Sequence, residues 1–277
     1  MTPAHRVAAH GAHIPALGFG TWQLTGDVCI AAVEAALACG YRHVDTARMY
    51  DNEREVGQAL RSSGVARDDI FVTTKVWYED IGAGALEKSA EESLGRLSLD
   101  QVDLLLIHWP NAKIPLRESI GALCAARRRG LARHIGVSNF PVALLDEAVA
   151  LAGEPLVANQ CEYHPWLDQS ALIAACRRHG LAFTSYCPLG RGDVAAEPAI
   201  AAIAERLRRT PSQVVLRWHV QQEGVVAIPR SRSPDHIAEN FGIFDFALTT
   251  DDMGAVSALQ RANRRLTNPG WSPRWDV

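Results

Sequence analysis

Residues 102–137 read VDLLLIHWPNAKIPLRESIGALCAARRRGLARHIGV, and this stretch contains one full repeat of the pattern that decides the fold. The apolar run Val102–Ile107 predicts a buried strand, and the Ala/Leu/Arg-rich segment after it predicts an amphipathic helix. Gly130 follows that helix and precedes a second short apolar run, His134–Val137, as expected of a glycine that ends a helix. A strand, a helix and a further strand in this order are typical of a βα unit in a parallel sheet.

The same alternation of short apolar runs and amphipathic segments continues from one end of the chain to the other. Gly40 and Gly180, like Gly130, each follow a helical run and precede a candidate strand. The runs that predict strands are Ala16–Phe19, His43–Asp45, Ile70–Lys75, Val102–Ile107, His134–Val137, Val157–Gln160, Ala182–Ser185 and Val225–Ile228. Eight strands, each followed by a plausible helix, predict an α/β fold of the (β/α)8 TIM-barrel class.

The length of the chain agrees with one such barrel. Its 277 residues match the ~250 that this fold typically needs, and no Ser/Gly-rich linker interrupts them, so we expect a single domain over residues 1–277. A doubly wound α/β sheet is the competing architecture, because its strands would look similar. The segment Gly18-Phe19-Gly20-Thr21-Trp22-Gln23 lacks the third glycine of the dinucleotide-binding fingerprint, which disfavours that alternative.

The composition argues against several classes of protein. A net charge of -3 gives no broad attraction for nucleic acid or for an anionic membrane, and no run of ~18 apolar residues predicts a membrane span. The six cysteines form no CxxC pair, so we expect reduced, structural thiols, and we expect no metal site. The N-terminus has no signal-peptide pattern, so we expect a cytoplasmic protein, and a monomer is the plainest oligomeric state.

The carboxyl ends of the strands in such a barrel meet at one mouth, and here they carry a distinctive set of side chains. Lys75 ends one apolar strand, Asp45 ends the neighbouring strand, and His108 follows a third. A buried ammonium is costly unless it is paired, and Asp45 can supply the counter-ion. Tyr50 lies in the polar loop after Asp45, before a helix that we expect Asn52 to cap.

Together these four residues suggest an acid catalyst. A free phenol has a pKa of ~10, and we expect the ammonium of Lys75 to lower the pKa of Tyr50 and make it a better proton donor. His108 can orient and polarise a carbonyl oxygen through an imidazole N–H. A structural ion pair between Lys75 and Asp45, and a satisfied core histidine at His108, are the alternatives.

Three tryptophans also follow strand ends. Trp22, Trp77 and Trp109 could line an apolar slot above a reacting carbonyl, or they could pack in the core beneath the rim. With Tyr50 and His108 they form the expected substrate pocket.

Polar side chains at the later strand ends suit a flat amide-bearing ring. Tyr186 could stack on a ring such as nicotinamide, whereas Ser138, Asn139 and Gln160 offer donors and acceptors for a carboxamide. Residues of these types near strand ends also commonly serve turns and caps, which is the alternative here.

Five stretches, in order along the chain, resemble recurrent signatures of the aldo-keto reductase superfamily, and the match runs from about Ala16 to Asn240. They are Gly18–Trp22, Gly40–Ala47, Tyr50–Glu53, Leu106–Pro110 and Ile135–Phe140. The resemblance implies a (β/α)8 barrel with an N-terminal β-hairpin cap and extra C-terminal helices. It also implies that a catalytic tetrad is formed by Asp45, Tyr50, Lys75 and His108, with Tyr50 as the general acid in reduction.

The resemblance further implies that NADPH binds extended over the barrel mouth, with no Rossmann domain. The residues that it assigns to the cofactor are Gly20, Thr21, Trp22, Asp45, Ser138, Asn139, Gln160, Tyr186, Pro188, Leu189, Pro229, Arg230, Ser231, His236, Glu239 and Asn240. Arg230 and Ser231 would meet a 2′-phosphate, and Glu239 and Asn240 the adenine. The family usually carries arginine at the position of His236, so selection for the phosphate should be weaker and NADH use stays open.

Within the superfamily, the compact length and the ending Trp271–Asp276 are similar to bacterial 2,5-diketo-gluconate reductases of the shorter type, which is associated with methylglyoxal reduction. The expected partner is thus a small-molecule carbonyl substrate, and the short connections predict an open mouth. One rival is an NADPH-binding sensor with little turnover. Another is a hydrolytic barrel that pairs Asp45 with Glu162, or binds a metal through His108 and His164. The turn-like position of Glu162 and the lack of an HxH pair after the first strand disfavour both hydrolases.

Overall fold

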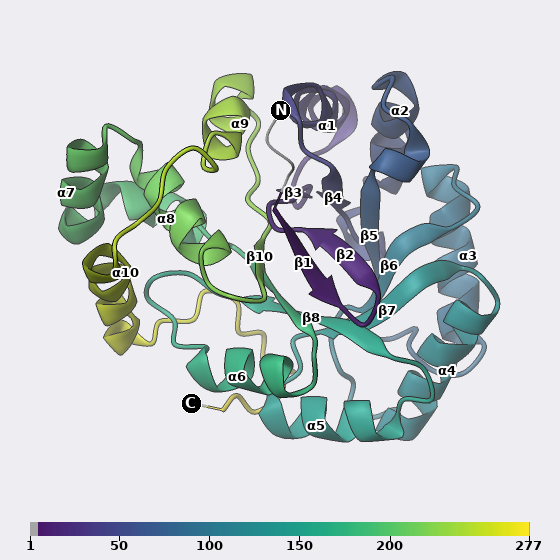
Figure 1. Cartoon of the computed structure of the whole chain (residues 1–277). Helices are drawn as coiled ribbons and strands as arrows, with labels where there is room; N and C mark the ends of the chain where they lie inside the picture. The colour runs from purple at the N-terminus through teal and green to yellow at the C-terminus, as the bar shows by residue number, and fades with distance from the viewer. Residues whose placement is uncertain (1–4, 277) are drawn as a thin grey trace.

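The computed structural model describes residues 5–276, and its centre is an eight-stranded parallel sheet surrounded by helices (Figure 1). The strands are β3 (Phe19–Gly20), β4 (His43–Asp45), β5 (Phe71–Val76), β6 (Val102–Ile107), β7 (Ala132–Ser138), β8 (Leu156–Glu162), β9 (Ala182–Tyr186) and β10 (Val225–Ala227). Each strand pairs in parallel with the next one along the chain, from β3 to β10. This order is the one that the repeated βα pattern predicts.

The sheet closes on itself between its first and last strands. Leu17 forms a parallel bridge with Ala227, and Gly20 N donates a hydrogen bond to the Pro229 carbonyl at 2.9 Å. The expectation of a first strand at Ala16–Phe19 is wrong in its bounds, because the residues before Phe19 pair with β10 only through this isolated bridge. The regular strand β3 begins two residues after Leu17. The (β/α)8 barrel itself is confirmed.

Helices connect the strands and form the outer layer. They are α1 (Gly26–Cys39), α2 (Glu53–Ser62), α3 (Ala85–Leu97), α4 (Leu116–Arg128), α5 (Val142–Leu151), α6 (Ser170–Arg178), α7 (Pro198–Leu207), α8 (Pro211–Val220), α9 (Pro234–Phe241) and α10 (Thr250–Ser257). Two helices exceed the eight of the simple repeat. Helix α10 follows the last βα unit, as expected, whereas α7 is inserted between β9 and α8 and contacts both α8 and α10.

Glycine ends three of the helices in the way that the sequence predicts. Gly40, Gly130 and Gly180 have φ angles of 118°, 77° and 69°, a left-handed region in which residues with a Cβ are strained. Gly40 N donates to the Leu37 carbonyl, which satisfies one of the free carbonyls at the end of α1. Each turn returns the chain to the sheet within a few residues, which keeps the barrel compact.

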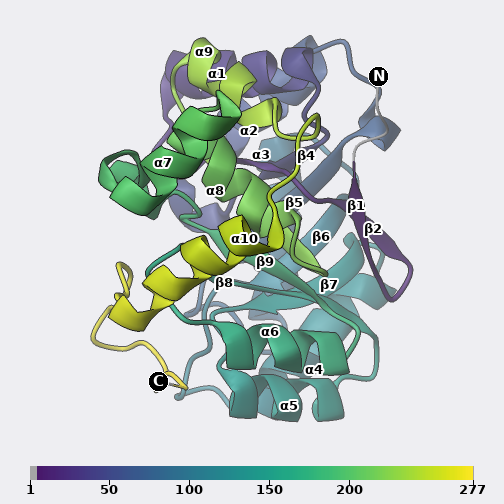
Figure 2. The same ribbon diagram turned by 60° about the vertical axis from the view of Figure 1, so that its left-hand side comes forward.

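The two ends of the barrel are covered by different parts of the chain. A hairpin of β1 (Arg6–Ala9) and β2 (Ala12–Pro15) pairs antiparallel, and its His13 lines a hollow with Ile70 and His134, which lie at the starts of β5 and β7. The expected hairpin cap is therefore confirmed. Figure 2 shows the hairpin and the C-terminal tail on opposite sides of the barrel, so the tail lies toward the carboxyl ends of the strands.

Burial explains why the strands read as continuous apolar runs. Every residue of β5, β6 and β8 is buried, because the helices cover the outer face and the opposite strands cover the inner one. Polar residues in these strands therefore need internal partners. Within residues 5–276, no helix combines the length and the apolar character needed to cross a membrane.

Candidate active site

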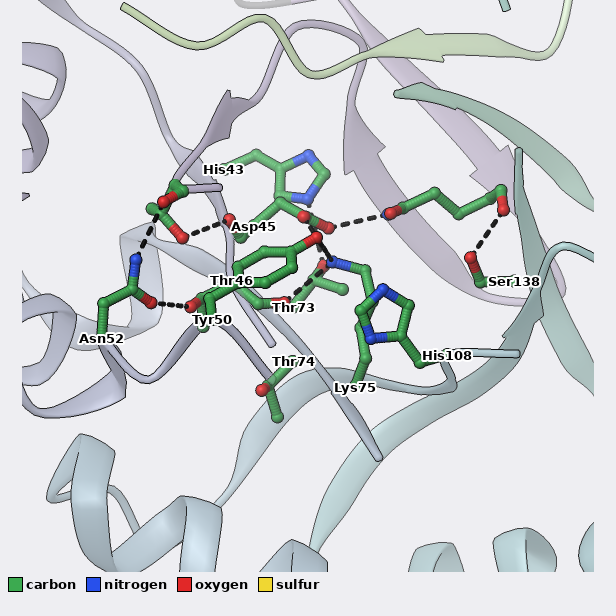
Figure 3. A network of polar contacts seen from close by, with 12 residues as sticks. His43, Asp45, Thr46, Tyr50, Asn52, Thr73, Thr74, Lys75, His108 and Ser138 are labelled. Atoms are coloured by element: carbon green, nitrogen blue, oxygen red, sulfur yellow. Dashed lines mark hydrogen bonds and ion pairs between the residues drawn. The ribbon is translucent and has the colours of Figure 1, made fainter. Parts of the chain in front are cut away.

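The carboxyl ends of three neighbouring strands bring charged and polar side chains together at the mouth. Asp45 ends β4, Lys75 is the next-to-last residue of β5, and His108 directly follows β6. Tyr50 comes from the short 3-10 turn η1 (Arg48–Tyr50) between β4 and α2. Figure 3 shows the Tyr50 hydroxyl and the His108 ring on either side of the Lys75 amine.

The ammonium of Lys75 uses all three of its N–H groups within this cluster. Its Nζ donates to Asp45 Oδ1 at 2.6 Å, to the Thr46 carbonyl at 2.8 Å and to Tyr50 Oη at 3.3 Å. Both members of the Lys75–Asp45 pair are buried, with exposed side-chain fractions of 0% and 1%. Since the hydroxyl oxygen of Tyr50 accepts from Lys75, its proton is directed elsewhere, toward the mouth or another acceptor.

Burial, and not the ammonium, dominates the acidity of Tyr50. Burial raises the pKa of Tyr50 well above its ordinary value, and the negative charge of Asp45 raises it further. Burial also lowers the pKa of Lys75, an effect that Asp45 partly offsets. The expected lowering of the pKa of Tyr50 is therefore not found in this structure, because burial and the negative charge of Asp45 both oppose its ionisation.

His108 is a neutral imidazole in this environment. Burial lowers its pKa well below the ordinary value, and the positive charge of Lys75 lowers it further. Its Nδ1 is buried and has no hydrogen-bond partner among the described residues. A proton on Nδ1 would be a buried, unpaired donor, which costs more than an unpaired lone pair, so the proton resides on Nε2. The His108 ring contacts Tyr50 edge-on at a centroid distance of 5.7 Å.

The loop that carries Tyr50 is held by Asn52, in a way that the sequence does not predict. Asn52 precedes α2, but its side chain makes no capping hydrogen bond, so the expectation of a cap is wrong. Instead, Asn52 Nδ2 donates to the carbonyls of Thr21 and Leu24, and Oδ1 accepts from the Thr46 hydroxyl. The buried amide thus joins the loop after β3 to the loop after β4, which fixes the position of Tyr50.

The residues expected to hold a carboxamide form a connected group beside the cluster. Ser138 Oγ donates to the Gln160 carbonyl at 2.7 Å, and Asn139 Nδ2 donates to Ser138 Oγ at 3.1 Å. Tyr186 Oη donates to Asn139 Oδ1 at 2.9 Å. Asn139 has a φ of 64°, a left-handed conformation that asparagine tolerates better than most residues. Gln160 Nε2 donates to Asp45 Oδ2 at 2.7 Å, so this group also touches the tetrad.

The residues expected at the other end of the cofactor lie along β10 and the start of α9. Arg230 is partly buried, and among the described residues its side chain donates only to the neutral Gln23 side chain, at 3.0 Å from Nη2. Ser233 caps α9 through a bond from His236 N, and Ser231 Oγ accepts from Ser233 N. Burial and the neighbouring Arg232 lower the pKa of Arg230.

The remaining residues of that set differ in exposure. Pro188, Pro229 and Asn240 are buried or nearly so, Leu189 and Ser231 lie at the edge of the barrel, and His236 and Glu239 are exposed. Gly20 and Thr21 are buried at the end of β3, where Thr21 Oγ1 donates to the Asp45 carbonyl. The set thus combines buried positions next to the barrel with exposed side chains on α9.

An aromatic wall borders the cluster, and part of it comes from the C-terminal tail. Trp22 packs on Tyr50 at a centroid distance of 4.9 Å, and Trp77 contacts His108 at 5.2 Å. Trp271, in the tail, stacks on Tyr78 at 4.4 Å with an angle of 3° between the rings. It also contacts Trp77 and Trp109 edge-on. The sequence prediction of the pocket missed Tyr78, which lies two residues after the end of β5, and Trp271, which lies in the tail far from any strand.

Glu162 holds the tail against the barrel. Its Oε1 accepts from Leu266 N at 2.5 Å and from His164 Nε2 at 3.1 Å, and its Oε2 accepts from Thr267 N at 2.7 Å. Burial acts against its charge, yet the bonds from His164 and the two backbone amides leave the pKa of Glu162 lowered. Both oxygens of Glu162 are thus engaged with the tail, and Asp45 is engaged with Lys75 and Gln160, so the two do not behave as a free carboxylate pair.

Comparisons with known proteins identify the family of the chain. Residues 16–261 match the model of the aldo/keto reductase family. The chain belongs to the aldo/keto reductase family. It is therefore an enzyme of the NADPH-dependent oxidoreductase class. The methylglyoxal reductase DkgB of Escherichia coli O157:H7 is 40% identical to it over 266 residues, which cover 95% of this chain and 99% of that protein.

Solved structures of similar proteins have the same fold. The crystal structure of a putative 2,5-diketo-D-gluconic acid reductase B superposes on this aldo-keto reductase with a TM-score of 0.96 and 45% identity, covering 99% of this chain and 98% of that one. A mutant of Gox0644, solved in complex with NADPH, superposes with a TM-score of 0.89 and 36% identity, and 98% of each chain is covered.

The residues at the mouth fit a nicotinamide cofactor. Gln160 Nε2 faces the carboxylate of Asp45, so its Oε1 points away from Asp45 and can accept from the amide of a carboxamide. Arg230 is in no ion pair among residues 5–276 and so has a charge available for a phosphate. A carboxamide acceptor and a guanidinium without an acidic partner in the described part of the chain match the amide and the 2′-phosphate of NADPH.

Proposed function

We propose that this aldo-keto reductase reduces small aldehydes and ketones to alcohols with NADPH, and that Tyr50 is the proton donor. The observation that carries the proposal is the hydrogen bond from Lys75 Nζ to Tyr50 Oη, at 3.3 Å, within a cluster that also contains Asp45 and His108. This contact occupies the oxygen of Tyr50 and leaves its proton for a substrate. A structural ion pair alone would not need a tyrosine at this place.

The four side chains divide the work of protonating a carbonyl oxygen. NADPH, when bound, supplies a hydride to the carbonyl carbon. Tyr50 gives its proton to the oxygen as negative charge develops there, and it takes the proton back in the reverse direction. His108 donates through Nε2–H to the same oxygen and orients it.

Lys75 makes the proton transfer favourable at the moment of reaction. The raised pKa of Tyr50 keeps the phenol protonated at neutral pH, so the acid form is present before the substrate arrives. A developing alkoxide is a far stronger base than a phenolate, so Tyr50 can still donate to it. The ammonium then stabilises the phenolate that remains, and Asp45 keeps the ammonium in place.

The cofactor contacts in this proposal follow the arrangement of the residues. Ser138, Asn139 and Gln160 hold the carboxamide, and Tyr186 stacks on the nicotinamide ring. The loop at Pro188 and Leu189 lies along the pyrophosphate, and Arg230 binds the 2′-phosphate. A full list of the proposed contacts also includes Gly20, Thr21, Trp22, Asp45, Pro229, Ser231, His236, Glu239 and Asn240. With an imidazole at His236 in place of a permanently charged guanidinium, NADH is a weaker second cofactor.

The proposed substrates are small 2-oxoaldehydes such as methylglyoxal and keto-sugar acids such as 2,5-diketo-gluconate. Similarity to proteins with those names supports this choice, and the aromatic wall of Trp22, Trp77, Trp109 and Trp271 supports an apolar slot beside the reacting carbon. A panel of such carbonyls, assayed through the near-ultraviolet absorbance of NADPH with NADH in parallel, tests the proposal. We expect carbonyl-dependent loss of NADPH, faster than that of NADH.

A sensor that binds NADPH without turnover is the second candidate, and the same assay separates the two. A sensor would quench or shift the fluorescence of bound NADPH but leave its absorbance constant with every carbonyl in the panel. The paired Lys75 and Asp45 beside Tyr50 favour the enzyme, since mere binding does not need an acid catalyst. Absorbance that stays flat with all carbonyls would overturn the reductase proposal.

We also propose that the chain acts as a single-domain monomer in the cytoplasm. Support comes from the six cysteines, which are all free in the structure, as is usual in a reducing compartment. Light scattering coupled to gel filtration tests the oligomeric state, with a mass near 30.2 kDa as the expected result.

A further inference from the structure

Gln160 connects the residues expected to bind the cofactor with those expected to move the proton. It lies inside the barrel on β8 with an exposed fraction of 2%. Its Nε2 is 2.7 Å from Asp45 Oδ2, and Asp45 Oδ1 is 2.6 Å from Lys75 Nζ. The carboxylate of Asp45 is therefore held on both sides, by the amide on one oxygen and by the ammonium on the other.

The backbone holds Gln160 in this position. Its carbonyl accepts from Ser138 Oγ at 2.7 Å and from Asn139 N at 2.9 Å, so β8 cannot shift at this residue without breaking both bonds. The side-chain amide of Gln160 can then point either its Nε2 or its Oε1 toward Asp45. Because a carboxylate can only accept, Nε2 must face Asp45, and Oε1 must face away from it.

We propose that Gln160 is a positioning residue that couples cofactor binding to the proton donor. This inference rests on the proposed reductase function. Nε2 fixes the carboxylate of Asp45 so that its other oxygen stays on Lys75, and Lys75 in turn stays within reach of Tyr50. Oε1 accepts an N–H of the carboxamide, so the bound cofactor holds Gln160 in the orientation that keeps Asp45 fixed.

Loss of the hydrogen bond between Gln160 and Asp45 would weaken the interaction of Asp45 with Lys75. Without the amide, Asp45 Oδ2 would be a buried carboxylate oxygen with no donor, and the carboxylate could rotate away from Lys75 to find one. Lys75 would then lose part of the charge that opposes its burial, and the pKa of the ammonium would fall. A less fully charged Lys75 stabilises the Tyr50 phenolate less well.

The substitution Gln160→Glu separates the two roles of the side chain. Glutamate keeps the length and an oxygen that can accept from a carboxamide, but at neutral pH it has no donor for Asp45. The two carboxylates would repel each other, and a proton shared between them at lower pH would restore the hydrogen bond. Gln160→Met keeps the length and removes both functions at every pH.

Other titratable groups face this pair and bear on the test. They are His43 on β4, Lys75 on β5, Tyr50 in η1 and His108 directly after β6, together with Glu53, whose charge acts on Lys75, and Cys187, whose charge acts on Tyr50. All of them are present in both the wild type and the variants. The comparison of each variant with the wild type at the same pH therefore isolates the new carboxyl.

The experiment measures kcat for methylglyoxal reduction and the Kd of NADPH by fluorescence, for the wild type and both variants, from about pH 6 to about pH 8. For Gln160→Glu we expect a Kd within about threefold of wild type and a kcat at least about tenfold lower at pH 8, with a deficit at least about threefold smaller at pH 6. For Gln160→Met we expect a weaker Kd and a low kcat at every pH. Gln101→Glu, at the opposite end of the barrel where Gln101 bonds to the Gly130 carbonyl, is the matched control.

Urea unfolding of the cofactor-free protein provides a readout that does not depend on activity. The glutamate in Gln160→Glu should have a raised pKa beside Asp45, so the loss of stability relative to wild type should be larger at pH 8 than at pH 6. A raised Kd with an unchanged kcat, or a kcat deficit that is equal at both pH values, would overturn the coupling. If the wild type itself does not oxidise NADPH with any carbonyl, the reductase proposal fails instead, and the unfolding result still tests the contact with Asp45.

Discussion

Lys75 donates a hydrogen bond to the hydroxyl oxygen of Tyr50 at 3.3 Å, while its two other N–H groups go to Asp45 and to the Thr46 carbonyl. An ammonium has three donors, and all three are used here. The arrangement gives Tyr50 a protonated resting state, because burial raises its pKa, and a cation ready to stabilise the phenolate after the proton leaves.

The buried pair of Lys75 and Asp45 should show its interdependence in stability. Lys75→Met leaves a carboxylate unpaired in the interior, and we expect the free energy of unfolding to fall by about 3–5 kcal/mol. The double variant Asp45→Asn/Lys75→Met removes both charges and should recover more than half of that loss. Urea unfolding at pH 7, followed by tryptophan fluorescence, measures both values. Additive losses in the double variant would contradict the pairing.

Buried histidines should make the protein less stable in mild acid. Burial lowers the pKa of His43 and of His219 to about 4. The unfolded chain therefore binds more protons than the folded one between about pH 6.5 and pH 4, so the free energy of unfolding should be constant above that window and decrease as pH falls through it. The slope should be up to about 1.4 kcal/mol per pH unit for each histidine. Urea unfolding at pH 7.5, 6.0 and 5.0 measures it.

His43→Asn is the variant that tests this origin, with the exposed His5→Asn as its control. The first should give a shallower dependence on pH than the wild type, and the second should leave it as it is. Equal slopes in all three proteins would assign the acid sensitivity to other groups.

The sequence predicts the barrel and the tetrad for the same reason. Strands such as Val102–Ile107 are buried on both faces and so read as continuous apolar runs, and the carboxyl ends of parallel strands must meet. The sequence therefore predicts that a lysine, an aspartate and a histidine at the ends of β5, β4 and β6 lie close together at the mouth of the barrel. The hydrogen bonds of Lys75 show that it lies close to Asp45 and Tyr50.

Features that depend on contacts between distant parts of the chain could not be predicted. Trp271 reaches Tyr78 from the tail, whose backbone is bound by Glu162 at Leu266 and Thr267, and no periodicity relates these positions. Asn52 directly precedes α2, as a capping residue would, but its side chain donates a hydrogen bond to the Thr21 carbonyl in the loop after β3. The pKa of Tyr50 depends on burial, which a list of neighbouring charges does not give.

The tail tryptophan should affect substrate binding more than catalysis. Trp271 is 42% exposed and forms one side of the aromatic wall. We expect Trp271→Ala to raise KM for an aromatic aldehyde by about 2- to 10-fold, with a smaller effect on methylglyoxal and little change in kcat, because stacking contributes about 0.5–1.5 kcal/mol. Steady-state kinetics measure this, with Arg274→Ala, also in the tail, as a control. A change confined to kcat would argue that the tail acts on the tetrad.

Arg230 should distinguish the two cofactors. It has no acidic partner among the described residues, so its guanidinium is free for the 2′-phosphate that only NADPH carries. Arg230→Ala should raise KM for NADPH by about 10-fold and leave KM for NADH nearly unchanged, which corresponds to a loss of about 1.4 kcal/mol. Parallel titrations with both cofactors test this, and Arg129→Ala, at the end of α4, is the control. Equal increases for the two cofactors would contradict the assignment.

The most direct test of the account is the turnover of Tyr50→Phe. The change removes one hydroxyl and keeps the ring that packs between Trp22 and His108. We expect a Kd for NADPH within about threefold of wild type and a loss of at least about 1000-fold in the rate of methylglyoxal reduction, since the general acid is gone. Retention of a substantial rate of NADPH oxidation by Tyr50→Phe, with the cofactor still bound, would contradict the claim that Tyr50 is the proton donor.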